Sequence, residues 1–425
     1  MGARGRIGMG ILLAALALHG GAVEATTIPV AARNGALAEA VATASAGDHL
    51  ILEAGRHEGP LLLAKPITIE GRPGAEIAGA GQGTVITVTA RNVTLTNLTL
   101  SGSGDHAIDF DAGVQALKGS DGLTVEHCRL TGNLFGIVLR GVTGARIAGN
   151  EIANRRDLYE TSLGNGIHLL STSDSTIEAN RLSGGRDGIY SEASHGNRLI
   201  ANRMSGVRFA IHAMYSNRLQ VEDNRSAGNK IGYALMYSDH IAVQRNISDG
   251  DLDEGLMIHT THHSLIQDNL VMRSPERCVF IYTAAKNVIR GNHIDECGIG
   301  LHFSGGSEDN EVYENAFIGN RTQVKYSGTV YYEWSKDGHG NYWSDNTAFD
   351  RFGTGIAETA YRPNSVTDRL IWRYPTAKLL LAGPVMEALR VAQGQFPALM
   401  PGGVIDSHPL MMPPALPNSL METGS

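Results

Sequence analysis

A six-residue motif that occurs eight times between positions 147 and 317 decides the fold. Its copies are IAGNEI (147–152), IEANRL (177–182), LIANRM (199–204), VEDNRS (221–226), VQRNIS (243–248), IQDNLV (266–271), IRGNHI (289–294) and VYENAF (312–317). The fourth position is always asparagine, and successive asparagines are 30, 22, 22, 22, 23, 23 and 23 residues apart. A period in the low twenties is too short for a pair of helices and is typical of one coil of a β-solenoid.

Alternation of apolar and polar residues predicts short strands around these asparagines. A second alternating pair follows later in each period, at 167/169, 189/191, 211/213, 233/235, 256/258, 279/281 and 301/303. Period-two alternation with β-branched residues indicates strands with one buried face. Stacked coils pair each strand with its copy one period away, in parallel and about 4.8 Å apart. The sequence therefore predicts an all-β protein, a right-handed parallel β-helix, with the asparagines at a repeated corner where their amides bond each other and the backbone.

The regions outside the repeat have different compositions. Arg4 and Arg6, the apolar run 9–18 and the small-residue site 23–25 are typical of a cleaved signal peptide, although a membrane anchor is the alternative. Helical spacing within 35–46 predicts a cap over the open end of the core. The predicted organisation is a signal peptide (1–25), an N-terminal cap with first strands (26–90), β-helix coils (91–327), a C-terminal loop and helix region (328–395, helix 377–393) and a Pro/Met-rich tail (396–425).

The net charge and the cysteine content argue against two classes of protein, namely nucleic-acid-binding and disulfide-rich proteins. The formal net charge of −8 argues against a nucleic-acid partner. Only Cys128, Cys278 and Cys297 are present, so no disulfide framework is expected in an exported chain. Cys278 and Cys297 fall at different places in their periods, so the repeat neither predicts nor excludes a disulfide between them.

Residues between the buried ones should point outward and form columns on the surface. On three consecutive coils these columns combine methionine with histidine, namely His212, Met214, Met236, Met257 and His259. His240, His262 and His263 follow in the turns immediately beyond. Thioether and imidazole ligands are soft and favour Cu(I). We therefore predict a transient Cu(I) site on this face; the alternatives are packing under a loop or a partner, or a slip of one residue that turns the set inward.

The rival class is an enzyme or binding protein for polysaccharide. Such catalysis needs two or three carboxylates on one outward patch, and the outward columns contain Glu192 alone. The tripeptide 338–340 (GHG) echoes polygalacturonases but lies beyond the last predicted coil. Stacked Arg181, Arg203 and Arg225 could hold an anionic sugar or could be a solvated surface column. Binding without catalysis is the preferred interpretation.

Three further stretches resemble a known family. These are the cap from Ala36-Leu37 through Gly47-Asp48-His49-Leu50, the phrase GNYWSD (340–345), and the ending from 396–399 (FPAL) through 406–411 (DSHPLM). Together with the order of parts, they resemble the periplasmic nitrous-oxide reductase maturation proteins of the NosD family, which have a carbohydrate-binding/sugar-hydrolase-like (CASH) β-helix. The resemblance covers nearly the whole mature chain.

The resemblance implies a periplasmic location and a role in denitrification. Members work with an ABC-type permease and its cytoplasmic ATPase in building the copper–sulfur centre of nitrous-oxide reductase. The resemblance also implies that the protein accepts copper from a small membrane-anchored chaperone and passes it to the reductase. In this chain Trp343, Met411 and Met412 would then dock on the permease or the reductase. A β-helix that acts only as a docking scaffold, without touching copper, is the remaining alternative.

Overall fold

The computed structural model describes residue 2 and residues 25–326, 328, 330–374, 376, 383, 388 and 402–421. The predicted signal peptide lies outside the described residues except for residue 2 and its last residue, Ala25. The predicted helix 377–393 likewise lies outside them apart from positions 383 and 388, as do residues 396–401 of the tail.

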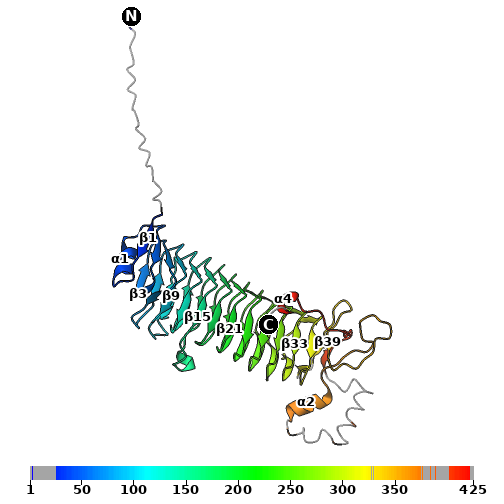
Figure 1. Ribbon diagram of the computed structural model, residues 1–425. Coiled ribbons are helices and arrows are strands. Elements are labelled where there is room, and N and C mark those ends of the chain that lie inside the picture. The colour runs from blue at the N-terminus through cyan, green and yellow to red at the C-terminus, as the bar shows by residue number, and fades with distance from the viewer. Residues whose placement is uncertain are drawn as a thin grey trace.

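Three parallel sheets wind around one core and form a long solenoid, as Figure 1 shows. Sheet A contains β1 (Thr27–Val30), β2 (His49–Leu52), β5 (Thr68–Gly71), β8 (Thr94–Thr96), β11 (Thr124–Glu126), β14 (Arg146–Ala148), β17 (Thr176–Glu178), β20 (Arg198–Ile200), β23 (Gln220–Glu222), β26 (Ala242–Gln244), β29 (Leu265–Gln267), β32 (Val288–Arg290) and β35 (Glu311–Tyr313). Sheet B contains β3 (Gly55–Glu58), β6 (Ala75–Ala78), β9 (Thr99–Ser101), β12 (Arg129–Thr131), β15 (Glu151–Ala153), β18 (Arg181–Ser183), β21 (Arg203–Ser205), β24 (Arg225–Ala227), β27 (Ile247–Asp249), β30 (Leu270–Met272), β33 (His293–Asp295), β36 (Ala316–Ile318) and β39 (Tyr342–Trp343).

Sheet C carries the predicted outward columns. Its strands are β4 (Leu61–Leu63), β7 (Ile86–Val88), β10 (Ala112–Ala116), β13 (Phe135–Arg140), β16 (Ile167–Leu170), β19 (Ile189–Glu192), β22 (Phe209–Met214), β25 (Ile231–Met236), β28 (Glu254–His259), β31 (Arg277–Tyr282), β34 (Ile299–Phe303) and β37 (Val324–Tyr326). Each strand pairs in parallel with its copy on the next coil, so the predicted β-solenoid is confirmed. The aliphatic columns are its core: Ile177, Leu199 and Val221 are all fully buried.

The asparagine column is a continuous ladder of hydrogen bonds inside one corner. From Asn150 to Asn341, each Nδ2 donates to the Oδ1 of the next asparagine, over 2.8 to 3.0 Å. The same Oδ1 also accepts the backbone N–H of the preceding asparagine, as Asn246 does from Asn224 at 3.0 Å. Every rung is buried, and buried polar groups need such partners. The ladder therefore fixes the register of successive coils.

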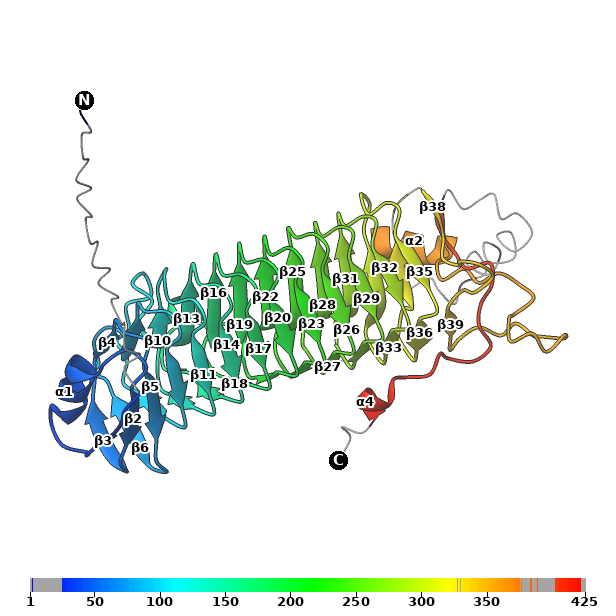
Figure 2. The same ribbon diagram turned by 90° about the horizontal axis from the view of Figure 1, so that it is seen from above.

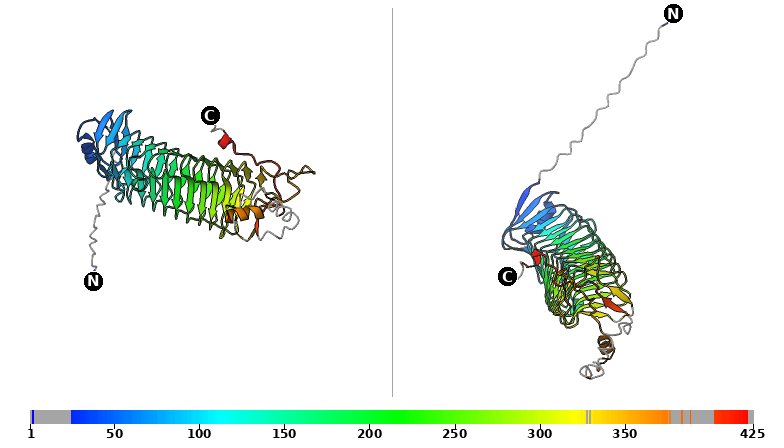
Figure 3. Two further views of the ribbon diagram at one scale, coloured as in Figure 1. Left: turned by 90° about the horizontal axis from the view of Figure 1, so that it is seen from below. Right: turned by 90° about the vertical axis from the view of Figure 1, so that its right-hand side faces the viewer.

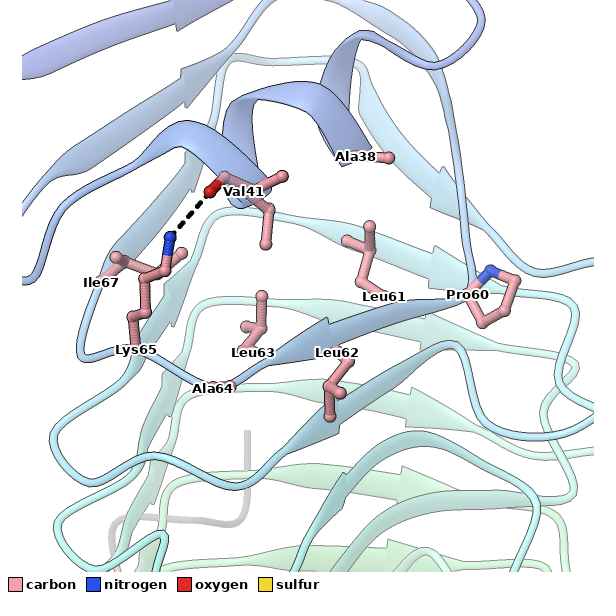
Figure 4. Close-up of a pocket in the computed structure, with 10 residues that line it drawn as sticks. Ala38, Val41, Pro60, Leu61, Leu62, Leu63, Ala64, Lys65 and Ile67 are labelled. Atoms are coloured by element: carbon pink, nitrogen blue, oxygen red, sulfur yellow. Dashed lines mark hydrogen bonds between the residues drawn. The ribbon is translucent and has the colours of Figure 1, made fainter.

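Helix α1 (Ala36–Thr43) covers the N-terminal end of the core, as its spacing predicts. In Figure 4 its residues Ala38 and Val41 lie over Leu61 and Leu63 of β4, in a shallow apolar pocket. Lys65 ties the helix down, because its Nζ donates to the carbonyl of Ala42 at 2.8 Å. The cap shields apolar side chains that no further coil covers.

The far end of the core is closed by segments distant in sequence. Strand β39 pairs with β36, which extends sheet B beyond the predicted coil limit at 327. Strand β40 (Gly403–Ile405) pairs with β38 (Tyr331–Glu333) and brings Asp406 against the chain at Gly340, where any Cβ would collide with that carboxylate. This contact explains the glycine in the GNYWSD phrase.

The C-terminal segment then runs back along the outside of the solenoid to α4 (Asn418–Met421), as Figures 2 and 3 show. The Nε2 of His293 on β33 lies 2.8 Å from the carbonyl oxygen of Pro414 and anchors it there. Helix α2 (Val366–Arg373) lies at the end of the solenoid and begins with a capping box between Ser365 and Asp368. A short 3-10 turn, Glu160–Ser162, occupies the insertion that lengthens the first repeat. In the described part of the chain, no helix has the length and apolar character to cross a membrane.

Candidate functional site

The predicted outward columns of sheet C are confirmed by the strand register. Met214 of β22 pairs with Met236 of β25, which pairs with His259 of β28. In the neighbouring column, His212 pairs with Ala234, and Ala234 pairs with Met257. The three strands lie side by side in the middle of the solenoid (Figure 2). We call these five residues, without Ala234, the Met/His face.

Ala234 is the centre of the Met/His face. It has His212 and Met257 as its neighbours across the sheet, about 4.8 Å away, and Met236 two residues along its own strand, about 6.6 Å away. Its outward methyl is nevertheless fully buried, because the longer side chains around it cover it. The register therefore places five residues with sulfur or nitrogen donors around one position that carries almost no side chain.

The members of the Met/His face differ in burial. Met214, Met236, Met257 and His259 are half-buried, whereas His212 retains only 7% of its exposure. His212 is buried because its ring packs between Tyr190, at a centroid distance of 4.9 Å, and Phe209, at 4.8 Å. The Met/His face is thus most buried at His212 and more accessible at its three methionines and His259.

A buried carboxylate orients His212. Its Nδ1 lies 3.1 Å from Oδ2 of Asp187, and Arg208 donates to both oxygens of the same carboxylate over 2.8 and 2.7 Å. Burial works to raise the pKa of Asp187, but the bonds from His212 and Arg208 outweigh it and hold that pKa below its ordinary value. The ionised carboxylate assigns the donor proton to Nδ1.

The second ring nitrogen of His212 is left free for a ligand. Its Nε2 is buried and has no hydrogen-bond partner among the described residues. A buried polar atom without a partner is costly and calls for an explanation. Metal-binding imidazoles characteristically donate their other N–H to a carboxylate, as His212 does to Asp187. The Asp187–His212 pair therefore has the arrangement of a histidine prepared for a metal ion.

Two other members, Met214 and His259, contact aromatic neighbours. The Tyr190 hydroxyl donates to Sδ of Met214 over 3.7 Å, and burial raises the pKa of Tyr190 to about 12, so that it stays a donor. His259 packs between Tyr237 and Tyr282, at centroid distances of 5.0 and 4.9 Å. Burial lowers the pKa of His259, which favours the neutral imidazole that a metal requires.

The predicted docking residues lie at the C-terminal end, and only two of them face solvent. Trp343 is 1% exposed, stacks on Phe317 at 4.3 Å, and donates its indole N–H to Asp406 over 2.8 Å. Its ring therefore closes the end of the core and could affect docking only indirectly. Met411 is 36% and Met412 77% exposed, so both can contact a partner.

The cysteines contribute no thiolate to the described surface. Cys278 and Cys297 form a buried disulfide, the bridge that the sequence left open. Cys128 is a free thiol, but it is buried, and burial raises its pKa to about 12. A thiol of that kind is unreactive and remains protonated.

The sequence did not predict that Asp187 and Arg208 support His212. The acidic residue in the turn before β19 was the one feature of the sequence that pointed to this role.

The three-sheet solenoid defines the class of protein, a right-handed parallel β-helix. A model of the right-handed β-helix region matches residues 71–225. Solved structures share the fold, including the A-module of mannuronan C-5 epimerase AlgE6 from Azotobacter vinelandii (TM-score 0.56, 14% identity, 68% of this chain and 89% of that one) and the Streptococcus pneumoniae surface adhesin PfbA (TM-score 0.55, 10% identity, 69% and 88%). Identities this low concern the fold alone.

The family is identified by closer relatives. A family model described as periplasmic copper-binding protein (NosD) matches residues 154–348. A probable ABC transporter binding protein NosD of Pseudomonas aeruginosa is 41% identical over 377 residues, which cover 86% of this chain and 88% of that protein. Its counterpart in Stutzerimonas stutzeri is 38% identical, with coverage of 85% and 86%. The chain belongs to the NosD family, and the resemblance seen in its sequence is confirmed.

Proposed function

We propose that this protein is a periplasmic accessory component of an ABC-type transporter that binds Cu(I) transiently and passes it on during assembly of the copper–sulfur centre of nitrous-oxide reductase. The family description as periplasmic copper-binding protein and the names of the two relatives support the general role. The observation that supports the copper site is the strand register, which places three methionines and two histidines on neighbouring positions around Ala234.

The donor set suits Cu(I) better than other ions. Thioether sulfur and neutral imidazole are soft or borderline ligands, and none of the five side chains is a carboxylate. Asp187 would act behind the metal, by orienting His212, and not as a ligand. Because no thiolate is available on the described surface, Cu(I) would be held by weaker bonds and could be transferred. This combination fits a carrier better than a permanent cofactor site.

Binding is favoured over polysaccharide catalysis at this face. The carboxylate of Asp187 is buried and engaged by Arg208, and that of Glu254 on β28 is buried and paired with Arg277. Glu192 on the neighbouring strand β19 is a third acid near the Met/His face. A glycosidase-like site needs two free carboxyl groups flanking a sugar bond. The epimerase likeness rests on the shared fold and gives no support for that chemistry here.

Partner docking is assigned to the C-terminal segment. Exposed Met411 and Met412 follow Asp406, whose bonds to Asn341 and Trp343 hold the segment on the solenoid. We propose that this end contacts the permease, which works with a cytoplasmic ATPase, or the reductase. The copper-donating membrane-anchored chaperone would reach the Met/His face from the side of sheet C.

An anaerobic Cu(I) titration of the mature protein against a competing chelator tests the site. We expect saturable binding of about one ion, lost when Met214, Met236, Met257 and His259 are all replaced by alanine. Met272→Ala is the matched control, because Met272 is a half-buried methionine on the outer side of sheet B. Circular dichroism of both variants verifies the fold. Unchanged copper stoichiometry in the four-residue variant would refute the site, and no binding by the wild-type protein would favour the docking scaffold.

A further inference from the structure

A second cluster of possible metal ligands lies on the turns that follow β25 and β28. It consists of Asp239, His240 and His263, whose ligand atoms all lie within 4.8 Å of one another. His240 and His263 occupy equivalent positions on consecutive coils, both in the left-handed region with φ of 55° and 49°. The cluster is separate from the Met/His face, although its two coils also carry Met236, Met257 and His259 of that face.

The three side chains converge on a common point. Oδ1 of Asp239 lies 2.9 Å from Nδ1 of His263 and 3.2 Å from Nδ1 of His240. The two imidazole rings are stacked, with centroids 5.3 Å apart and planes at 19°. A tetrahedral ion with bonds of about 2.0–2.1 Å separates its ligand atoms by roughly 3.3 Å. Small side-chain rotations would therefore admit an ion between these three atoms.

The backbone beneath the cluster is fixed by the stacking of the coils. The N–H of Asp239 donates to Oδ1 of Asn217 over 2.9 Å, and the N–H of His240 donates to the carbonyl of His262 over 3.1 Å. His262 itself serves the structure, because its Nδ1 accepts the backbone N–H of Ala285 at 3.1 Å. The ligand atoms thus project from a rigid scaffold.

Solvent access and confinement favour one ion at this position. The side chains of His240, His263 and Asp239 are 65%, 45% and 40% exposed, so an ion can enter with bound water. The equivalent turn positions on the flanking coils hold Arg218 and Lys286. These cations limit the site to two coils and leave room for a single ion.

We propose that Asp239, His240 and His263 bind one divalent transition-metal ion of the Zn(II) or Cu(II) class, with water completing the coordination. Two imidazole nitrogens and one carboxylate oxygen are borderline-to-hard ligands, in contrast to the thioethers of the Met/His face. The site goes beyond the proposed Cu(I) carriage and does not depend on it. The chain would then hold a soft and a harder metal site on adjacent parts of neighbouring coils.

Co(II) chloride is the probe, because four-coordinate Co(II) reports its ligands through d–d absorption. Competition with Zn(II) tests whether the site prefers this class of divalent ion. We expect the mature protein to bind one Co(II) that Zn(II) displaces. The double variant His240→Asn and His263→Asn should lose it, since asparagine tolerates the left-handed backbone but removes both imidazoles. The matched control is His106→Asn, an exposed imidazole that lies 4.0 and 3.5 Å from carboxylates of Asp105 and Asp109 without a second histidine.

The two metal proposals fail separately. The four-residue variant of the Met/His face should lose Cu(I) and keep Co(II), whereas the double variant should lose Co(II) and keep Cu(I). Equal Co(II) stoichiometry in wild-type protein and double variant, or no saturable Co(II) or Zn(II) binding by the wild-type protein, would overturn the second site. Loss of Cu(I) binding alone would leave it standing.

Discussion

Replacing Asp187 by asparagine tests whether the buried carboxylate prepares His212 for copper. The substitution keeps the size of the side chain but removes its charge. The amide offers one acceptor oxygen in place of two, so the two bonds from Arg208 and the bond from Nδ1 of His212 cannot all be kept. None of the five proposed copper ligands is changed. Any effect on copper must therefore pass through the orientation of His212.

The expected magnitudes follow from the burial of this ion pair. Breaking a buried pair by removing one partner costs about 3–5 kcal/mol. The side chain of Arg208 retains 16% of its exposure, so we expect the lower end, about 3 kcal/mol of unfolding free energy. Loss of a carboxylate behind a metal-binding histidine typically lowers metal affinity 10–100-fold, which is about 1.4–2.8 kcal/mol of binding free energy.

Two assays separate these effects. Urea unfolding measures stability, and chelator competition measures Cu(I) affinity at urea concentrations far below the unfolding midpoint. Asp223→Asn is the control, because Arg245 donates to Asp223 in the same two-bond geometry, over 2.9 and 3.0 Å, but both side chains are about one-third exposed. It should cost at most about 1 kcal/mol and leave copper affinity unchanged. An Asp187→Asn variant with wild-type Cu(I) affinity would refute the role assigned to Asp187.

Three further predictions concern the solenoid. Asn246→Ala removes one member of the asparagine ladder and leaves several buried hydrogen-bonding groups unpaired. The free energy of unfolding in urea should therefore fall by about 3 kcal/mol. A loss below about 1 kcal/mol would contradict the structural role of the ladder. Burial lowers the pKa of His168 from 6.5 to about 4. The stability that the neutral, buried imidazole provides is therefore complete above about pH 6.5 and is lost as the pH falls toward 4. The total loss is about 3 kcal/mol of unfolding free energy. The stability difference between wild-type protein and His168→Phe, measured from pH 7 to 4, should change with that slope, and a constant difference would count against it. Trp343→Ala should cost about 3–5 kcal/mol and speed proteolysis of the segment after Asp406, whereas an unchanged cleavage rate would argue against the closing role of the indole.

The fold and the outward columns could be predicted because they repeat. The spacing between Asn224 and Asn246 sets which residues of neighbouring coils meet, and period-two alternation sets which of them face out. The pairing of Met214 with Met236 and of Met236 with His259 follows from these two facts alone. Metal binding by this set stays a prediction.

The contacts that departed from the sequence analysis join residues outside the repeating columns. Asp187 lies in a turn 25 residues before His212, and only the side-chain conformations bring them together. Cys278 lies in β31 and Cys297 in the turn after β33, so no column argument could pair them. The burial of Trp343 likewise depends on Asp406, 63 residues later in the chain.

X-ray absorption at the copper edge of the mature protein, loaded anaerobically with one Cu(I), tests the central claim most directly. Because Cys278 and Cys297 are bonded and Cys128 is buried, any sulfur ligand must come from methionine. We predict a spectrum with thioether sulfur and imidazole nitrogen in the first shell, and loss of the sulfur contribution in the four-residue variant. A first shell of nitrogen and oxygen without sulfur would contradict a Cu(I) site on the Met/His face.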